Sequence, residues 1–106
     1  MGFPKELCDR VVTIYRPRKG QVLRQVVDAF YHYRDVWQED RFSREFLLVI
    51  PEDIPLEPGD RIYCGVGPQT VDWASFLPVC QPGLSQVRTA TPYYFRGRFH
   101  HWEATH

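Results

Sequence analysis

The sequence predicts an all-β fold, a small antiparallel barrel or sandwich of about six strands with at most one short helix near residues 71–77. Nine prolines and seven glycines divide the 106 residues into pieces that are short for helices. The pieces between them are rich in β-branched and aromatic residues, which favour strands. A chain of this length holds one core. We therefore expect a single β domain at 10–106, preceded by an N-terminal arm at 1–9.

The first half of the chain supplies three predicted strands. RVVTIYR at 10–16 is rich in β-branched residues and ends before Pro17. QVLRQVVDAFYHY at 21–33 has apolar residues at helical spacing, but its valines and aromatics favour a pleated surface. We favour a long strand here, with a helix as the alternative. EFLLVIPED at 45–53 contains a continuous apolar run, which predicts a strand buried on both faces that ends at Pro51.

A charged loop and a tight turn are predicted between strands. RDVWQEDRFSRE at 34–45 is strongly charged, which indicates a hairpin loop or a mobile excursion. Further along, Pro58 fixes φ at the first central position of a turn, and Gly59 supplies the positive φ needed at the second. Asp60 is expected to cap this structural turn, and RIYC at 61–64 follows as a strand.

The remaining residues predict a connection and two closing strands. GPQTVDWASFLP at 67–78 is the connection, in which Asp72 could cap one helical turn that Pro78 ends. SQVRTAT at 85–91 and YYFRGRFHHWEA at 93–104 are the last two predicted strands.

The composition argues against several classes of protein. The formal charge is zero, with 13 basic and 13 acidic residues, so a dedicated DNA or RNA binder is not indicated. No apolar run is as long as a membrane span, so we expect no membrane association. The three cysteines, Cys8, Cys64 and Cys80, form no CxxC pair, which argues against zinc and against a disulfide framework. A reducing compartment fits this cysteine usage.

The histidine-rich end of the chain, RGRFHHWEATH, looks like a metal or catalytic site. On a regular strand, however, His100 shares a face with Trp102, and His101 shares the other face with Glu103. Adjacent histidines on opposite faces do not readily ligate one metal ion. We therefore interpret the cluster as structural, with a partner contact or a metal site as the alternatives, and expect a bulge or bend at Gly97.

Other patterns give little support to an enzyme. Cys64 could pair with a histidine, but it lies in an apolar strand without an activating helix start. The serines lie in no GxSxG context, and GVGP at 65–68 lacks the lysine and helix of a phosphate-binding loop. The sequence therefore predicts no catalytic residue, no cofactor and no metal. A small hydrolase or metal protein is the third-ranked alternative.

A basic aromatic strip is a second possible function. Small β-barrels bind single-stranded nucleic acid with arginines and stacking aromatics. Alternating arginines and aromatics are also what the solvated face of an ordinary strand contains. The residues concerned are Arg16, Arg18, Lys19, Arg96 and Arg98, with Tyr15, Tyr94 and Phe95.

Large aromatics in the predicted connections are candidates for a protein interface. Trp37 and Phe42 lie in the charged stretch beside Arg44, and Trp73 and Phe76 lie in the proline-bracketed connection. Aromatic residues and arginine are enriched at the centres of protein interfaces. The alternative is that these side chains fold back over the ends of the domain as lids.

Five ordered motifs together resemble a known family. They are VTIYRP (12–17), VLRQVVDAFYHY (22–33), FLLVIP (46–51), LEPGDRIYCG (56–65) and HHWE (100–103). Their order is similar to that in small virion proteins of the head-to-tail module of tailed phages and prophages, especially of Gram-positive hosts. The resemblance covers most of the chain from residue 11 onward. The stretches at 34–45 and 67–78 depart from it.

This resemblance implies a function without catalysis. It implies a head-completion, stopper-like or minor capsid protein that forms a ring of identical copies and links the capsid portal region to the tail. The implied partners are other copies of the chain, proteins on the portal or adaptor side and tail-completion proteins, with DNA only passing through the ring. The implied location is the virion head–tail junction, after assembly in the host bacterial cytoplasm.

Overall fold

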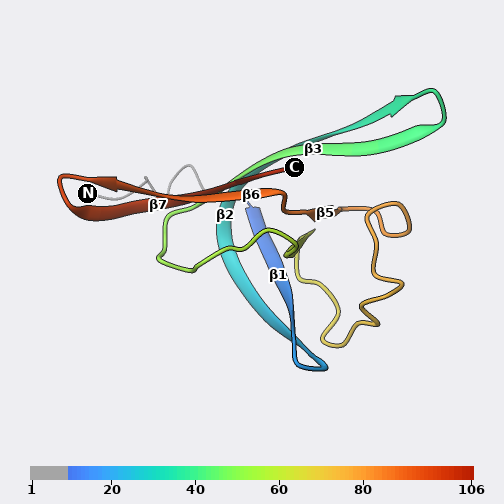
Figure 1. The fold of residues 1–106 in the computed structure, drawn as a ribbon, viewed down its shortest axis with the longest axis horizontal. Coiled ribbons are helices and arrows are strands. Elements are labelled where there is room, and N and C mark those ends of the chain that lie inside the picture. Colours follow the sequence, from blue (N-terminus) through green and yellow to red (C-terminus); the bar gives the residue numbers. More distant parts are fainter. Residues whose placement is uncertain (1–9) are drawn as a thin grey trace.

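The computed structural model describes residues 10–106, which form seven antiparallel strands in one sheet (Figure 1). The all-β prediction is confirmed, with one strand more than expected, and the predicted arm at 1–9 lies outside the described residues. The strand order is β5-β4-β1-β2-β3-β7-β6. The strands are β1 (Arg10–Arg18), β2 (Gln21–Gln38), β3 (Arg41–Ile50), β4 (Arg61–Cys64), β5 (Leu84–Gln86), β6 (Thr89–Phe95) and β7 (Arg98–Thr105).

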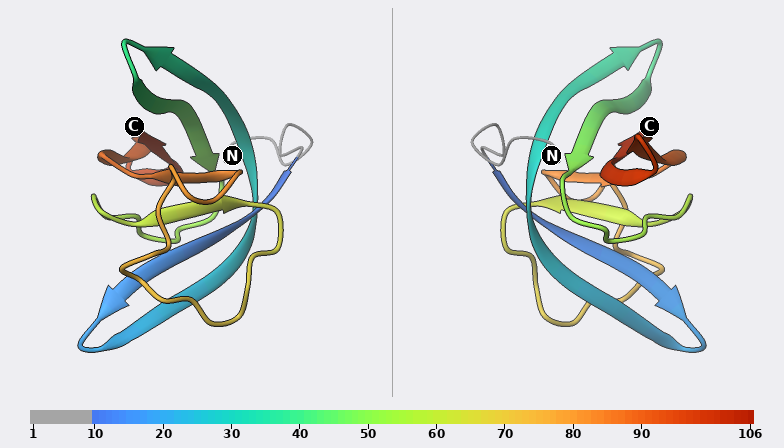
Figure 2. Two further views of the ribbon diagram at one scale, coloured as in Figure 1. Left: turned by 90° about the vertical axis from the view of Figure 1, so that its right-hand side faces the viewer. Right: turned by 90° about the vertical axis from the view of Figure 1, so that its left-hand side faces the viewer.

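The long strand β2 joins the two halves of the sheet. Its first part, up to Ala29, pairs with β1, and from Phe30 onward it pairs with β3. Figure 2 shows β2 curving between these partners, so that the two halves of the sheet face one another. The strand interpretation of residues 21–33 is confirmed, and the helical alternative is wrong. The sheet is curved but not closed, and its edge strands β5 and β6 follow each other in the chain.

The main core lies between the two halves of this curved sheet. Alternate residues of the strands point into it, as the period of a strand requires. In β2 these are Val27, Ala29 and Tyr31. The other buried members of this cluster come from the neighbouring strands and from two connecting segments: Val12, Ile14, Phe46, Leu48, Ile50, Leu56, Ile62, Val87 and Ala104.

A second cluster lies on the opposite face of β1. Tyr15, next to Ile14 in the sequence, packs edge-on against Phe76 with ring centroids 4.8 Å apart. Leu84 completes the buried part of this cluster, which Trp73 and other side chains border. The connection between β4 and β5 is thereby fixed to the outer face of the sheet.

Three hairpins end in two-residue turns. In each turn both residues have positive φ: Lys19–Gly20, Glu39–Asp40 and Arg96–Gly97. This combination matches the right-handed twist of the flanking strands, and it is the geometry of the type I′ turn. The sequence predicts a bend or bulge at Gly97 inside one long strand at 93–104. The structure instead has a hairpin turn there, which separates β6 from β7.

The charged stretch at 34–45 is not a loop, contrary to the prediction. β2 and β3 run through it, and only Glu39 and Asp40 lie between them. Its charges compensate each other across the ladder, because Arg34 lies opposite Glu45 at 3.0 Å and Asp35 lies opposite Arg44. Opposite charges on facing strand positions stabilise a hairpin.

The connection from residue 65 to residue 83 contains turns but no helix. Asp72 begins one such turn, because its carbonyl accepts from the N–H groups of Ser75 at 3.1 Å and Phe76 at 3.0 Å. The predicted strand at 85–91 is divided as well. β5 ends at Gln86 and β6 starts at Thr89, with a change of partner between them.

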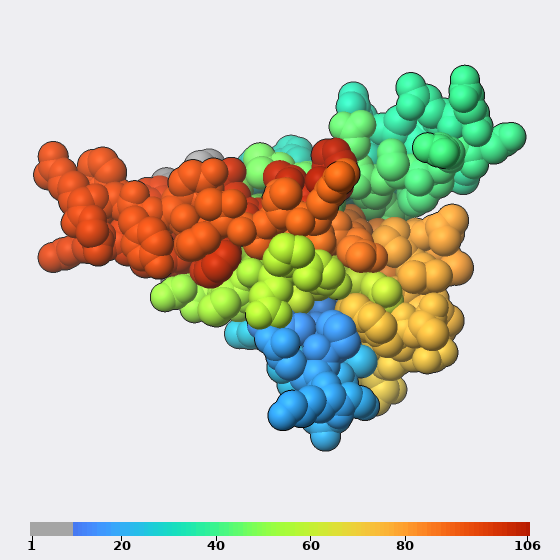
Figure 3. Space-filling model, in the orientation of Figure 1, coloured from blue at the N-terminus to red at the C-terminus, as the bar shows by residue number. Residues whose placement is uncertain are grey.

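The hairpins give the molecule an extended outline. The β2–β3 and β6–β7 hairpins project to opposite sides, and the β1–β2 hairpin projects in a third direction (Figures 1 and 3). The principal extents are 44, 34 and 21 Å. The tips of the hairpins therefore lie far from the shared core.

Candidate functional site

The predicted turn at Pro58–Gly59 is a structural element that anchors β1. Gly59 has φ of 95°, and Asp60 N–H donates to the Glu57 carbonyl at 3.1 Å. The Asp60 carboxylate is 1% exposed and accepts from Glu57 N–H at 2.9 Å and from both Nε and Nη2 of Arg16, at 2.9 and 2.7 Å. This bidentate pair raises the pKa of Arg16, despite the opposing effect of burial. The turn is thus fixed by charge as well as by backbone geometry.

Among the predicted interface residues, Trp37 is the most exposed. It lies in the β2–β3 hairpin at 69% exposure, with its ring 5.0 Å from that of Phe42 across the ladder. Arg44 does not face solvent, because its side chain is only 6% exposed. Its guanidinium binds Asp35, which lowers the pKa of that carboxyl, and it also donates to the Leu84 carbonyl. Arg44 therefore connects the hairpin to β5 within its own chain.

Phe76 and Trp73 also serve the chain's own fold. Phe76 is 4% exposed in the second cluster. The Arg61 guanidinium lies 3.8 Å from the centroid of the Trp73 ring and donates to the carbonyls of Trp73 and Phe76, the latter at 2.7 Å. Burial lowers the pKa of Arg61, and its Nε has no hydrogen-bond partner among residues 10–106. Of the five predicted interface residues, Trp37 and Phe42 are left at a projecting surface.

The β6–β7 hairpin exposes aromatic residues that are not among the predicted interface residues. Tyr93, Tyr94 and Phe95 are 43, 63 and 61% exposed, and Arg96 lies over the Phe95 ring at 5.3 Å. The sequence contains a signal for this. Three consecutive aromatics on a strand point alternately to both faces, and an edge hairpin cannot cover both.

The histidine cluster has a geometry that simple strand alternation did not predict. The pairing of β7 with β6 shifts by one residue at His100, which forms a β-bulge. The Nδ1 atoms of His100 and His101 consequently lie 2.6 Å apart, and the expectation that the two rings point to opposite faces is wrong. His101 Nε2 lies 2.8 Å from Glu103 on the same face, as predicted, and its ring stacks on Tyr93 at 5.0 Å.

The arrangement around these histidines is a chain of hydrogen bonds. The His101 imidazole connects the His100 imidazole to the Glu103 carboxylate. The Tyr93 ring stacks on the His101 imidazole. Across residues 10–106, no group of three or more histidine, cysteine, aspartate or glutamate side chains is arranged to hold a metal ion.

The basic aromatic strip considered above is divided in space. Arg16 and Arg18 lie in β1 and pair with Asp60 and Glu57, and Tyr15 is fully buried. Arg96 and Arg98 belong to the β6–β7 hairpin, on another side of the molecule (Figure 1). Only the second group combines exposed arginines with exposed aromatics.

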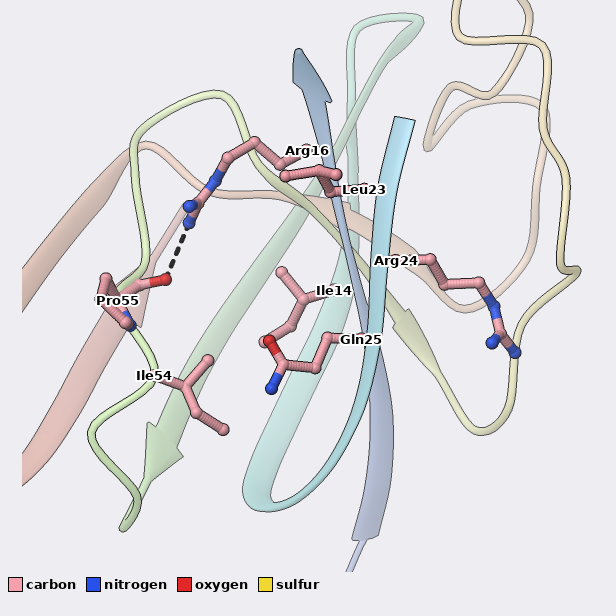
Figure 4. Close-up of a pocket in the computed structure, with 7 residues that line it drawn as sticks. All are labelled: Ile14, Arg16, Leu23, Arg24, Gln25, Ile54 and Pro55. Carbon is pink, nitrogen blue, oxygen red and sulfur yellow. Dashed lines mark hydrogen bonds between the residues drawn. The ribbon is translucent and has the colours of Figure 1, made fainter. Parts of the chain in front are cut away.

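A pocket of about 140 Å³ lies beside the β1–β2 hairpin (Figure 4). Both arginines that line it donate hydrogen bonds to backbone carbonyls. Arg16 donates to the Pro55 carbonyl at 2.7 Å, and Arg24 points away from the pocket toward the Gly67 carbonyl at 2.8 Å. The other lining residues are Ile14, Leu23, Gln25, Ile54 and Pro55. The pocket lining therefore offers no carboxylate, thiol or imidazole.

A wider groove of about 310 Å³ lies beside the β2–β3 hairpin. It is formed by Phe42 and its neighbours in β3 on one side and by residues 77–79 on the other, with Gln86 also lining it. Val79 is 66% exposed there. The β2–β3 end of the molecule thus combines an exposed Trp37–Phe42 pair with an adjacent, partly apolar groove.

Within residues 10–106 there is no helix of the length and apolarity needed to cross a membrane. No family model, curated protein or solved structure matches the chain.

Proposed function

We propose that this chain is a non-enzymatic structural virion protein, a head–tail connector of the head-completion or stopper type. In this function, copies of the chain assemble into a ring that links the capsid portal region to the tail. The proposal starts from the resemblance of five ordered motifs, which run from VTIYRP at 12–17 to HHWE at 100–103.

The observation that carries the proposal is the pair of hairpins that leave large aromatics in solvent. Trp37 at one end and Tyr94 and Phe95 at the other are each more than 60% exposed. Projecting aromatic surfaces of this kind are typical of sites that bind another protein. A subunit of a ring needs two such surfaces, because each subunit contacts two neighbours through different patches.

The first test is the assembly state of the purified chain. We expect rings in electron micrographs and a defined oligomer mass by light scattering, formed by the chain alone or on addition of the portal protein encoded by the same genome. Binding to the tail-completion protein of that genome should follow ring formation. A chain that stays monomeric and binds neither protein would contradict the proposal.

A nucleic-acid-binding module is the second candidate, and the β6–β7 hairpin is the observation that favours it. Arg96 is the first residue of its turn and Arg98 follows the turn, and the neighbouring Tyr94 and Phe95 are exposed aromatics of the kind that stack on bases. Single-stranded oligonucleotides should then bind with an affinity that falls as salt rises. Unchanged fluorescence anisotropy of a labelled oligonucleotide at low salt would eliminate this candidate.

A further inference from the structure

We infer that two copies of this chain bind end to end, with the β6–β7 hairpin of one copy docked on the β2–β3 end of the next. This inference rests on the proposed function and adds to it the two surfaces that form each contact of the ring. It follows from opposite charges and matching aromatics at the two ends of one molecule.

The β6–β7 hairpin is the basic end. From Arg88 through Trp102 the sequence contains three arginines, counting Arg88, and no acidic residue. Arg96 and Arg98 stand at the turn, both are exposed, and neither forms an ion pair with any of residues 10–106. Tyr94 and Phe95 precede the turn and are also exposed. The tip therefore presents positive charge next to apolar surface.

The β2–β3 hairpin is the acidic end. Its turn consists of Glu39 and Asp40, both exposed and neither ion-paired within the described part of the chain. Arg41 directly follows the turn, is exposed and forms no ion pair with any of residues 10–106, so the tip carries one net negative charge. Further along the strands, Asp35 and Arg44 neutralise each other. Trp37 and Phe42 flank the turn, and Phe42 also lines the groove that reaches residues 77–79. The acidic tip thus stands beside apolar surface that can receive the aromatics of another copy.

The positions of the two ends suit a head-to-tail contact. Figure 3 shows them projecting from opposite sides of the body, along the longest dimension of the molecule. A contact between different patches of identical chains repeats from copy to copy, and it closes into a ring when the rotation permits. Because the chain has zero formal charge, no general repulsion opposes the attraction between opposite ends.

The test exchanges charge at the first position of each turn. We would make Arg96→Glu and Glu39→Lys. Each new residue type already occupies this turn position elsewhere in the chain, since Glu39 has φ of 46° and Lys19 has φ of 45°. The backbone should therefore accept both substitutions. Lys19→Glu, in the β1–β2 turn, is the matched control, with the same charge change as Arg96→Glu at a hairpin outside the contact.

We expect Arg96→Glu and Glu39→Lys each to raise the concentration needed for assembly by about tenfold at low salt, because each places like charges in contact. An equimolar mixture of the two should assemble in alternation, since every contact then joins opposite charges again. The Lys19→Glu protein should assemble like the wild type. Circular dichroism of each monomer confirms the fold, and sedimentation velocity measures assembly.

Two results would overturn the inference in distinguishable ways. If the wild type forms rings and both variants assemble as readily as Lys19→Glu does, the contact lies elsewhere while the proposed function stands. The same conclusion follows if the mixture assembles no better than either variant alone. If the wild type forms no oligomer, alone or with its portal protein, the end-to-end contact and the proposed function both fall.

Discussion

At the scale of single residues, the buried hydroxyl of Tyr31 should make the domain less stable at alkaline pH. Tyr31 is fully buried, and its hydroxyl lies 2.6 Å from that of Ser85. Burial raises the pKa of Tyr31 to about 12, from 10.0, although the bond to Ser85 partly opposes this. Between these two values the unfolded chain releases the phenol proton and the folded chain keeps it. The free energy of unfolding should therefore fall as pH rises from about 10.

Tyr31→Phe tests this dependence. At neutral pH we expect the variant to be less stable by about 1–3 kcal/mol, because the Ser85 hydroxyl stays buried without its partner. The difference should shrink by on the order of 2 kcal/mol toward pH 12, since the variant has no phenol to ionise at this position. Urea unfolding from pH 8 to pH 12 measures both proteins. The pKa of Tyr15 is raised as well, but Tyr15 is common to both. Parallel loss of stability in the two proteins would contradict the prediction.

Single residues were predictable from sequence where their function is local. The turn functions of Gly59 and Asp60 were predicted from sequence, because the requirements of a tight turn, a positive φ and a capping carboxylate, are met within four consecutive residues. The direction of the His100 ring was not predicted, because it depends on a β-bulge. A bulge is set by the alignment of two strands, and the sequence of one strand alone does not determine that alignment. Arg44 is a similar case, since its carbonyl partner in β5 lies 40 residues away in the chain.

At the scale of elements, one arginine holds the connection between β4 and β5 against the sheet. Arg61 reaches from β4 to the carbonyls of Trp73 and Phe76 and stacks on the Trp73 ring. An ammonium group can donate hydrogen bonds, but it cannot reproduce the stacking of the planar guanidinium on the Trp73 ring. We expect Arg61→Lys to destabilise the domain by about 1–3 kcal/mol. Hydrogen exchange at the Ser75 and Phe76 amides, which close the turn at Asp72, should accelerate.

The matched control for this change is Arg18→Lys. Arg18 also forms an ion pair, with Glu57 at 3.0 Å, but half of its side chain is exposed. Exposed pairs contribute about 0–1 kcal/mol, so this variant should keep both its stability and its exchange rates. If Arg61→Lys leaves exchange at residues 75 and 76 unchanged, the connection is held by the packing of Phe76 and Leu84 instead.

The strands were easier to predict than their ends. Valine and aromatic content predicted the strand that is β2, and a continuous apolar run predicted the strand that is β3, but the charges between them suggested a loop. The error arises because charge alone does not distinguish a solvated loop from a solvated hairpin, and ladder pairs such as Arg34–Glu45 become visible only once the register is known. The Arg96–Gly97 turn, in contrast, carried a local signal, since glycine at the second position is typical of a type I′ turn.

At the scale of the whole molecule, the curved sheet has two apolar clusters that share their strands. β1 places Ile14 in the main core and its neighbour Tyr15 in the second cluster. β5 does the same, since Leu84 lies in the second cluster while Ser85 bonds to Tyr31 in the main core. Neither cluster can open without disturbing strands that the other requires. Residues 10–106 should therefore unfold as one cooperative unit.

Two single-tryptophan proteins can test this cooperativity, because Trp73 borders the second cluster and Trp102 packs against the main core. One variant keeps Trp73 and the other keeps Trp102, with phenylalanine at the remaining tryptophan positions. In each variant the fluorescence transition in urea should coincide with the transition in far-ultraviolet circular dichroism. Comparing two probes within one variant removes the effect of the substitutions on stability. If the Trp73 fluorescence transition occurs at a lower urea concentration than the circular dichroism transition, the β4–β5 connection detaches first. In that case the strands that the two clusters share are not sufficient to couple their unfolding.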